Sequence, residues 1–263
     1  MKTKMPFKKG DFLLLDYTAK VKETGETFDT TNQETAKSER LYKEGEIYEP
    51  KLIVVGEGWL LKTVDDALPT LKLNKSQTIE IPPDNAFGPR DPEKLKTIPL
   101  KRLRDKGITP QLGQRIEYDK KLATIRTLGA GRVTLDFNPP LAGKTLVYEV
   151  VAKKKLKTPE EKIAALIHRR IPVIDITKFQ LDITKTQTTI HVPEDAFYLE
   201  GLQLAKRGVA VDIQRFFSDI TKIRLIETFE TPKKEVAAEK KPAPKKKPRK
   251  PKTEKAAKTA KTE

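Results

Sequence analysis

The sequence contains no cysteine and only two histidines, His168 and His191, which lie far apart along the chain. Without cysteine there is no disulfide, no thiol nucleophile and no thiolate metal site, and such a composition suits a reducing cytoplasm. Two distant histidines also count against a histidine-rich metal site. We therefore predict that the protein holds no metal and needs no cofactor.

Serine is scarce as well, since the chain has only Ser38, Ser76 and Ser218. Together with the lack of a phosphate-binding glycine loop, this counts against hydrolysis and phosphoryl transfer. Long hydrophobic runs are also missing, because no segment approaches the roughly 20 apolar residues that cross a bilayer. Residues 1–9 lack the apolar part of a signal peptide. We expect a soluble, cytoplasmic protein with no membrane partner.

The chain has 263 residues, of which 37% are hydrophobic, and this is enough to bury more than one core. Its net charge of +16 is unevenly placed. Residues 231–263 hold twelve lysines and one arginine against four glutamates, a net charge of +9 that leaves +7 for the rest. This Lys/Pro/Ala-rich tail has no aromatic residue, and Val236 is its one large apolar side chain. We expect the tail to be disordered.

Residues 50–88 carry the clearest local pattern, which predicts a strand, a tight turn, a short helix and a second strand. Residues 52–55 form an apolar, β-branched run, and Gly56 and Gly58 supply the backbone freedom for the turn. Helical spacing then places one set of side chains on an apolar face: Leu60, Leu61, Val64, Ala67 and Leu68. The polar side of this helix would carry Lys62, Asp65 and Asp66. Such a helix would lie across a half-solvated antiparallel sheet, to which the alternating residues 77–81 belong.

Two further segments predict strands of the same sheet. Residues 13–21 alternate between apolar and polar side chains, and a turn at Thr24-Gly25 leads into a returning strand at residues 27–30. This hairpin would bring Tyr17, Phe28 and Asp29 close to one another. Residues 146–150 alternate again and predict a closing strand.

Four segments in the same order resemble the FKBP-type peptidyl-prolyl isomerases, most closely the members, SlyD among them, that carry an inserted flap domain. These segments are DYTAKVKETGETFDTT, GEGWLLKTVDDAL, PPDNAFG and DFNPPLAGKTLVYEV. The resemblance implies a half-open antiparallel sheet over a short helix, with a shallow apolar pocket that accepts a proline ring. An Xaa-Pro bond is held planar by resonance behind a barrier of about 18–20 kcal/mol. A dry pocket shaped for the twisted amide would lower that barrier without any nucleophile.

The resemblance also implies which residues form the site. The catalytic set would be Tyr17, Asp29, Phe87 and Tyr148. The substrate pocket would be lined by Phe28, Trp59, Leu60, Leu61, Val64 and Leu141. The sequence departs from the family at several positions: Phe87 stands where many relatives have tyrosine, Val64 replaces a large aromatic floor, and Thr63 replaces a common glycine. These departures count against macrolide binding and high peptide activity more than against the fold. Pro139 stands where relatives often have histidine, but little in the mechanism depends on it.

The family sheet is interrupted by residues 89–135, which contain three predicted strands at residues 114–118, 123–128 and 132–137. Their position resembles the insert-in-flap domain, which in the family holds unfolded chains near the pocket and so tethers them. A purely structural insertion is the alternative. Candidate exposed apolar residues of this insert are Pro99, Leu100, Ile116, Tyr118 and Ile125.

A further unit begins at Thr158 with a capping box and proline at the first helical position. It should contain strands at residues 179–183, 188–192 and 221–229 and helices at residues 193–207 and 209–217, and it is similar to the extra C-terminal domain of long archaeal FKBP relatives. The predicted fold is therefore α+β. Its parts are an isomerase domain at residues 1–88 and 136–156, an insert at 89–135, a C-terminal α+β domain at 157–230 and a tail at 231–263.

The predicted function is cis-trans isomerisation of Xaa-Pro bonds in unfolded or nascent polypeptides. One alternative is a holdase chaperone or interaction protein with little catalysis, which Val64 and Phe87 favour. Another is association with nucleic acid or ribosomes through the basic tail, whose charge would bind by salt-sensitive counterion release. The C-terminal domain could also form a homodimer.

Overall fold

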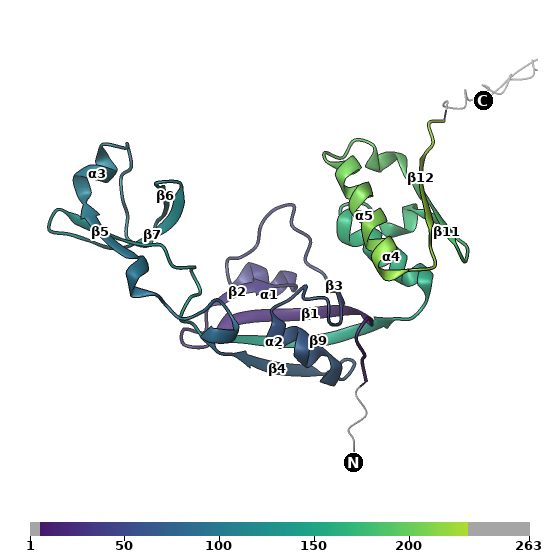
Figure 1. Ribbon diagram of the computed structural model, residues 1–263, viewed down its shortest axis with the longest axis horizontal. Coiled ribbons are helices and arrows are strands. Elements are labelled where there is room, and N and C mark those ends of the chain that lie inside the picture. Colours follow the sequence, from purple (N-terminus) through teal and green to yellow (C-terminus); the bar gives the residue numbers. More distant parts are fainter. Residues whose placement is uncertain (1–5, 231–263) are drawn as a thin grey trace, which may run out of the picture. The chain divides into compact units, whose positions relative to one another are not determined.

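The computed structural model describes residues 6–230, and the predicted tail lies outside the described residues. The strands of this part of the chain gather in three separate sheets (Figure 1). Short helices accompany the first two sheets, and two long helices accompany the third. The α+β class predicted from the sequence is confirmed.

The first sheet has five strands in the order β2-β1-β9-β4, with β3 also paired to β1. Its strands are β1 (Phe12–Val21), β2 (Thr27–Thr30), β3 (Lys51–Val54), β4 (Ser76–Ile81) and β9 (Leu146–Leu156). β9 pairs with one edge of β1 along its whole length, so β2 and β3 follow each other along the opposite edge. The alternation predicted for residues 13–21 is confirmed, since Leu13, Leu15, Tyr17, Ala19 and Val21 are all buried. This face of the sheet is the floor of the main core.

The helix α2 (Lys62–Ala67) covers that face, and a 3₁₀ turn, η1 (Leu68–Thr70), ends it. Val64 and Leu68 are fully buried against the sheet. Asp65 was predicted on the solvent side, and this was wrong, because its side chain is buried. Its two carboxylate oxygens accept hydrogen bonds from the backbone N–H groups of Gly56 and Gly58, at 3.0 and 3.1 Å. A buried carboxylate thus fixes the turn that delivers the chain to α2.

The connections of this part contain α1 (Gln33–Ser38), which Asn32 caps, and the 3₁₀ turn η2 (Pro83–Asn85). The second sheet belongs to the insert and has the strand order β5-β8-β7-β6. Its elements are η3 (Pro92–Lys94), β5 (Leu95–Pro99), α3 (Leu100–Arg104), β6 (Arg115–Tyr118), β7 (Lys121–Gly129) and β8 (Arg132–Asp136). The three predicted strands are confirmed, and β5 is an additional one that pairs with β8.

The prediction of which apolar residues of the insert are exposed was partly wrong. Ile116, Tyr118 and Ile125 are buried in the core of the insert rather than exposed. Strand alternation defines two faces but does not say which face is solvated, and here α3 covers the face that carries these residues. Leucines elsewhere in the insert are exposed instead: Leu95, Leu112, Leu122 and Leu128.

The two ends of the insert are joined by a buried carboxylate, Asp136. It accepts hydrogen bonds from the Arg90 and Arg126 guanidinium groups, at 2.6 and 2.9 Å, and from the backbone and side-chain amides of Asn138. Burial alone would raise the pKa of Asp136, but the hydrogen bonds from Asn138 and the arginines outweigh it and lower that pKa below its ordinary value.

The third sheet has the order β10-β11-β12, with the last two strands parallel. Its unit contains α4 (Pro159–Arg170), η4 (Ile176–Lys178), β10 (Gln180–Ile183), β11 (Gln187–Val192), η5 (Glu194–Ala196), α5 (Leu202–Phe216) and β12 (Lys222–Glu227). The predicted capping box is confirmed: the Thr158 hydroxyl accepts from the Glu161 N–H at 3.2 Å, and the Glu161 carboxylate accepts from the Thr158 N–H.

The prediction of two helices at residues 193–207 and 209–217 was wrong. One helix, α5, runs from Leu202 to Phe216 and passes through Gly208 without a break. Gly208 does not end the helix but permits a close approach. A Cβ atom at this position would lie 3.0 Å from Nε of Arg170, whose guanidinium is bound to Asp212 by hydrogen bonds of 2.8 and 3.0 Å. The glycine therefore makes room for the ion pair between Arg170 and the buried Asp212 that joins α4 to α5.

A second hydrophobic cluster joins this unit to the first sheet. Phe12, Leu52, Val54 and Leu156, on the face of the sheet away from α2, pack in one cluster with the buried residues of α4 and α5. Phe12 meets Phe216 edge to face, with ring centroids 5.2 Å apart. The sheet is therefore covered on both faces near β3, and Trp59 takes part in both clusters.

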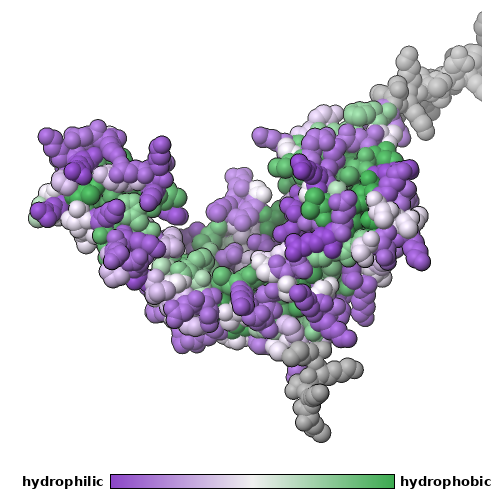
Figure 2. All heavy atoms as spheres, viewed as in Figure 1, coloured by the Kyte–Doolittle hydropathy of each residue, from purple (hydrophilic) through white to green (hydrophobic). Residues whose placement is uncertain are grey.

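In the view of Figure 2, hydrophilic side chains cover most of the visible surface and hydrophobic side chains emerge in separate patches. Among the described residues 6–230, no helix is both long enough and apolar enough to cross a bilayer.

Candidate active site

The predicted site residues of the first sheet lie together. Tyr17 comes from β1, Phe28 and Asp29 from β2, and Tyr148 from β9, where it is opposite Ala19. The Tyr17 hydroxyl donates a hydrogen bond of 2.9 Å to Oδ2 of Asp29. The ring centroid of Tyr148 is 5.9 Å from that of Tyr17 and 6.1 Å from that of Phe28. The hairpin and the closing strand thus build an aromatic wall with one carboxylate at its edge.

Neighbouring hydrogen bonds hold this wall in position. The Tyr17 backbone N–H donates to the hydroxyl of Thr31 at 3.0 Å, and its carbonyl accepts from the Thr31 N–H at 3.0 Å. Thr18 and Thr30 are joined through their hydroxyls across the same strand pair at 2.9 Å. The chain directly after Asp29 is therefore tied to β1.

The electrostatics of the wall favour neutral tyrosines. Burial, followed by the negative charge of Asp29, raises the pKa of Tyr17 far above its ordinary value. The same two causes raise the pKa of Tyr148 to about 12. Both hydroxyls therefore keep their protons at physiological pH, so they can donate hydrogen bonds but do not act as bases.

The helix side of the site is apolar. Val64 is fully buried beneath the wall, and Leu60 and Leu61, which precede α2, are half-buried against the same cluster. Leu141 also packs there, from the loop before β9. Phe87 differs from these residues because 42% of its side chain surface is exposed, while its neighbour Ala86 packs against the cluster.

Trp59 lies at the junction with the C-terminal unit. The Arg169 guanidinium is 3.8 Å from its ring centroid, and Phe216 meets it edge to face at 6.0 Å. Glu57, two residues before Trp59, forms an ion pair with Arg215 of α5. Trp59 is half-buried and packs against both hydrophobic clusters, and its role in the pocket remains a prediction.

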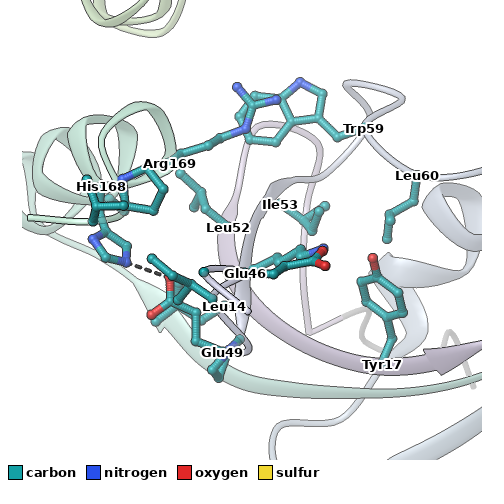
Figure 3. Close-up of a pocket in the computed structure, with 17 residues that line it drawn as sticks. Leu14, Tyr17, Glu46, Glu49, Leu52, Ile53, Trp59, Leu60, His168 and Arg169 are labelled. Carbon is teal, nitrogen blue, oxygen red and sulfur yellow. Dashed lines mark hydrogen bonds and ion pairs between the residues drawn. The ribbon is translucent and has the colours of Figure 1, made fainter. Parts of the chain in front are cut away.

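A cavity of about 550 Å³ adjoins this site (Figure 3). It is lined by Tyr17 and Leu60 at one end and by His168 and Arg169 of α4 at the other. Nε2 of His168 lies 2.6 Å from Oε1 of Glu49, an interaction drawn in Figure 3. Sequence reasoning missed the residues of α4, because a helix pattern shows which side is apolar but not which distant segment that side contacts.

No group of three or more His, Asp and Glu side chains that could hold a metal ion occurs in residues 6–230. The site residues described above form an apolar recess with neutral hydroxyls and one carboxylate, groups that can bind and orient an amide.

Comparison with known proteins places the chain in a family. It is 34% identical over 143 residues to the short-type peptidyl-prolyl cis-trans isomerase of Methanocaldococcus jannaschii, a match that covers 54% of this chain and 90% of the relative. It is 32% identical over 106 residues to a Pseudomonas fluorescens protein named probable FKBP-type 16 kDa peptidyl-prolyl cis-trans isomerase, covering 38% and 69% of the two chains. The chain belongs to the FKBP-type peptidyl-prolyl cis-trans isomerase family.

Other matches concern the added parts of this FKBP-type isomerase. The family model described as "FKBP26, IF domain" matches residues 96–141, and the model described as "FKBP26_C-terminal" matches residues 159–230. The SlyD protein of Helicobacter pylori is 27% identical over 124 residues, which is 46% of this chain and 66% of the relative. The resemblance to insert-bearing and long archaeal members is confirmed, whereas the roles of individual site residues remain predictions.

Proposed function

We propose that the protein accelerates cis-trans rotation of Xaa-Pro bonds in unfolded or nascent polypeptides. The observation that carries the proposal is the buried aromatic wall over Val64, with Asp29 held at its edge by Tyr17. An apolar recess of this kind disfavours the charge-separated, planar form of the amide, so it favours the twisted transition state over either planar isomer. Each 1.36 kcal/mol of that preference gives about a tenfold gain in rate.

The site residues have distinct roles in this proposal. Tyr17, Asp29, Phe87 and Tyr148 contact the amide that rotates, with Asp29 as the polar edge that orients it. The proline ring is enclosed by Phe28, Trp59, Leu60, Leu61, Val64 and Leu141. The exposed Phe87 provides contact area but no hydroxyl for the substrate carbonyl, so catalysis relies on the apolar recess and the Tyr17–Asp29 pair.

The proposal keeps the four parts of the chain given above and assigns the insert, residues 89–135, the role of holding clients. Three of its leucines, Leu112, Leu122 and Leu128, are 71, 56 and 46% exposed. Exposed apolar side chains of this kind bind the apolar segments of unfolded chains. A client held there meets the proline pocket at a raised effective concentration.

One experiment separates the two roles. It compares the intact protein, Asp29→Ala and the triple variant with serine at positions 112, 122 and 128, using a short Xaa-Pro peptide and a protein whose refolding waits on a proline. We expect Asp29→Ala to lose turnover of both substrates, whereas the triple variant fails only on the protein. The control Tyr198→Ser, at a residue 83% exposed in the C-terminal unit, should behave as the intact protein.

The rival function is a holdase with little catalysis, favoured by the small Val64 and by Phe87, which lacks a hydroxyl. If the intact protein turns over neither substrate above background yet suppresses aggregation, the isomerase proposal is wrong and the pocket is only a binding site.

Three finer proposals concern partners and location. The charge of +9 in residues 231–263 supports binding of nucleic acid or ribosomes, which a tail deletion tested at several salt concentrations would check.

A homodimer through the C-terminal unit is supported by two exposed apolar residues on α5. Leu204 is 76% exposed and Val211 is 53% exposed, and they lie seven residues apart on the same side of the helix. Leu204→Glu should dissociate this dimer, as measured by light scattering. A cytoplasmic location agrees with the absence of cysteine.

A further inference from the structure

The cavity beside the proposed proline pocket shares part of its lining with that pocket. Tyr17, Trp59 and Leu60 line the cavity and are also residues of the proposed pocket. Its volume of about 550 Å³ is within the range of sites that bind small ligands. A polypeptide bound with its proline in the pocket would therefore meet this cavity with a neighbouring residue.

The walls of the cavity come from parts of the chain that are far apart in sequence. The segment before and within β3 supplies Ile47, Pro50 and Leu52, while Ala165 of α4 and Val173 after it form the facing wall. These side chains are apolar, and the C-terminal unit closes one side of the cavity with residues of α4 and of the segment after it. A family member without that unit would have an open sheet edge here.

The charged groups at the cavity are engaged with partners inside the protein. Glu46 accepts a hydrogen bond of 3.3 Å from the Tyr48 hydroxyl, and the Lys51 ammonium lies 5.7 Å from the ring centroid of Tyr17. His168 is bound to Glu49 at 2.6 Å, and Arg169 stacks on Trp59 and lies 3.6 Å from Asp212. Because these groups already have partners, a ligand gains more from the apolar surface than from new ion pairs.

We propose that this cavity is a subsite for an apolar side chain that flanks the proline of a bound client. The inference rests on the proposed isomerase function and names the substrate class more closely: segments in which leucine-like residues lie within a few positions of a proline. Unfolded chains expose such residues, and removing one from water is favourable in proportion to its apolar area.

The test uses the full chain and two matched sets of peptides that contain one Xaa-Pro bond. In each peptide one of the three positions before Xaa or after the proline carries leucine in the first set and glycine in the second. A protease-free assay gives kcat/KM, and the emission of Trp59, the only tryptophan of the chain, reports binding. At one favoured position, leucine should raise kcat/KM about tenfold over glycine and shift the Trp59 emission.

Two variants and a matched control locate the effect. Val173 is 59% exposed at the cavity, so Val173→Asp should fold normally and abolish the advantage of leucine without changing the glycine peptide. Ala165→Leu, which fills part of the cavity, should reduce the same advantage. The control Leu73→Asp, at an aliphatic residue 48% exposed outside the cavity, should behave as the intact protein.

The outcomes distinguish this inference from the function on which it rests. Turnover of all peptides with no preference for leucine, or an equal loss on both peptides in Val173→Asp, would overturn the subsite and leave the isomerase standing. Absence of any turnover, with a leucine-dependent shift of Trp59 emission that Val173→Asp removes, would overturn the isomerase and support the subsite as a binding site.

Discussion

The hydrogen bond between Tyr17 and Asp29 gives the sharpest test of the site. The perturbation is Tyr17→Phe, which keeps the buried ring and removes only the hydroxyl that donates to Asp29 at 2.9 Å. A hydrogen bond to a charged group contributes about 1.5–3 kcal/mol when buried. Asp29 is only half-buried, so water can replace the lost donor, and we expect the lower end of that range, about 1.5 kcal/mol in the free energy of unfolding.

The same bond orients the carboxylate at the pocket edge, so catalysis should suffer too. We expect Tyr17→Phe to lower kcat/KM about tenfold, which corresponds to about 1.4 kcal/mol. The assay is protease-free isomerisation of a short Xaa-Pro peptide, together with urea unfolding to measure stability. Tyr198→Phe, which alters an exposed tyrosine, is the control and should change neither quantity.

A double-mutant cycle decides whether the pair acts as a unit. If Tyr17 works by orienting Asp29, then the double variant with Asp29→Ala should lose no more activity than Asp29→Ala alone, which corresponds to a coupling energy of about 1 kcal/mol or more. If the losses of the two single variants simply add, the two residues act independently and the reasoning is refuted.

Three further predictions concern stability, and urea unfolding measures each of them. Asp136→Ala should lower the unfolding free energy by about 2 kcal/mol, because Arg90 and Arg126 lose a shared buried carboxylate. Since the folded pKa of Asp136 is lowered, its stabilisation is complete above the unfolded value of about 4 and is lost as pH falls, so the variant should show a shallower acid dependence. Gly208→Ala should destabilise by about 1 kcal/mol despite better helix propensity, since the new methyl displaces an arginine held by two hydrogen bonds. The pKa of Tyr148 is about 10 in the unfolded chain and about 12 in the folded protein, so the intact protein should lose stability as pH rises from about 10 to about 12. Tyr148→Phe should abolish this pH-dependent loss, and the titration makes no difference to stability below pH 10.

The elements with strict local signals could be predicted from the sequence. The alternation of residues 13–21, the capping box at Thr158 and the short helix after Gly58 each have a pattern that is complete within a few residues, although the helix begins at Lys62 rather than at Leu60. The resemblance of four segments then placed Tyr17, Asp29 and the other pocket residues in one region, since their positions follow from strand pairing.

The errors have a common physical cause, because each concerns a residue whose environment is set by a distant segment. Asp65 appeared to be a surface carboxylate but satisfies the N–H groups of a turn seven to nine residues earlier. Gly208 appeared to be a helix end but faces Arg170 on another helix. Ile116 alternated correctly, yet only the packing of α3 determines that its side of the strand is interior. For the same reason, no local pattern indicated that α4 reaches the cavity beside Tyr17.

The position of the cavity bears on which kinetic constant the C-terminal unit affects. Rotation about the Xaa-Pro bond moves one flank of the client relative to the other, while a side chain held in the cavity stays fixed on the side of Tyr17 and Leu60. Such a contact is equally strong in the planar and twisted forms, so it lowers KM without raising kcat. Val173→Asp should therefore raise KM for leucine-flanked peptides at unchanged kcat, in contrast to Asp29→Ala, which should lower kcat. A fall of kcat in Val173→Asp would mean that the C-terminal unit shapes the transition state itself, and that the flank contact is made only when the amide is twisted.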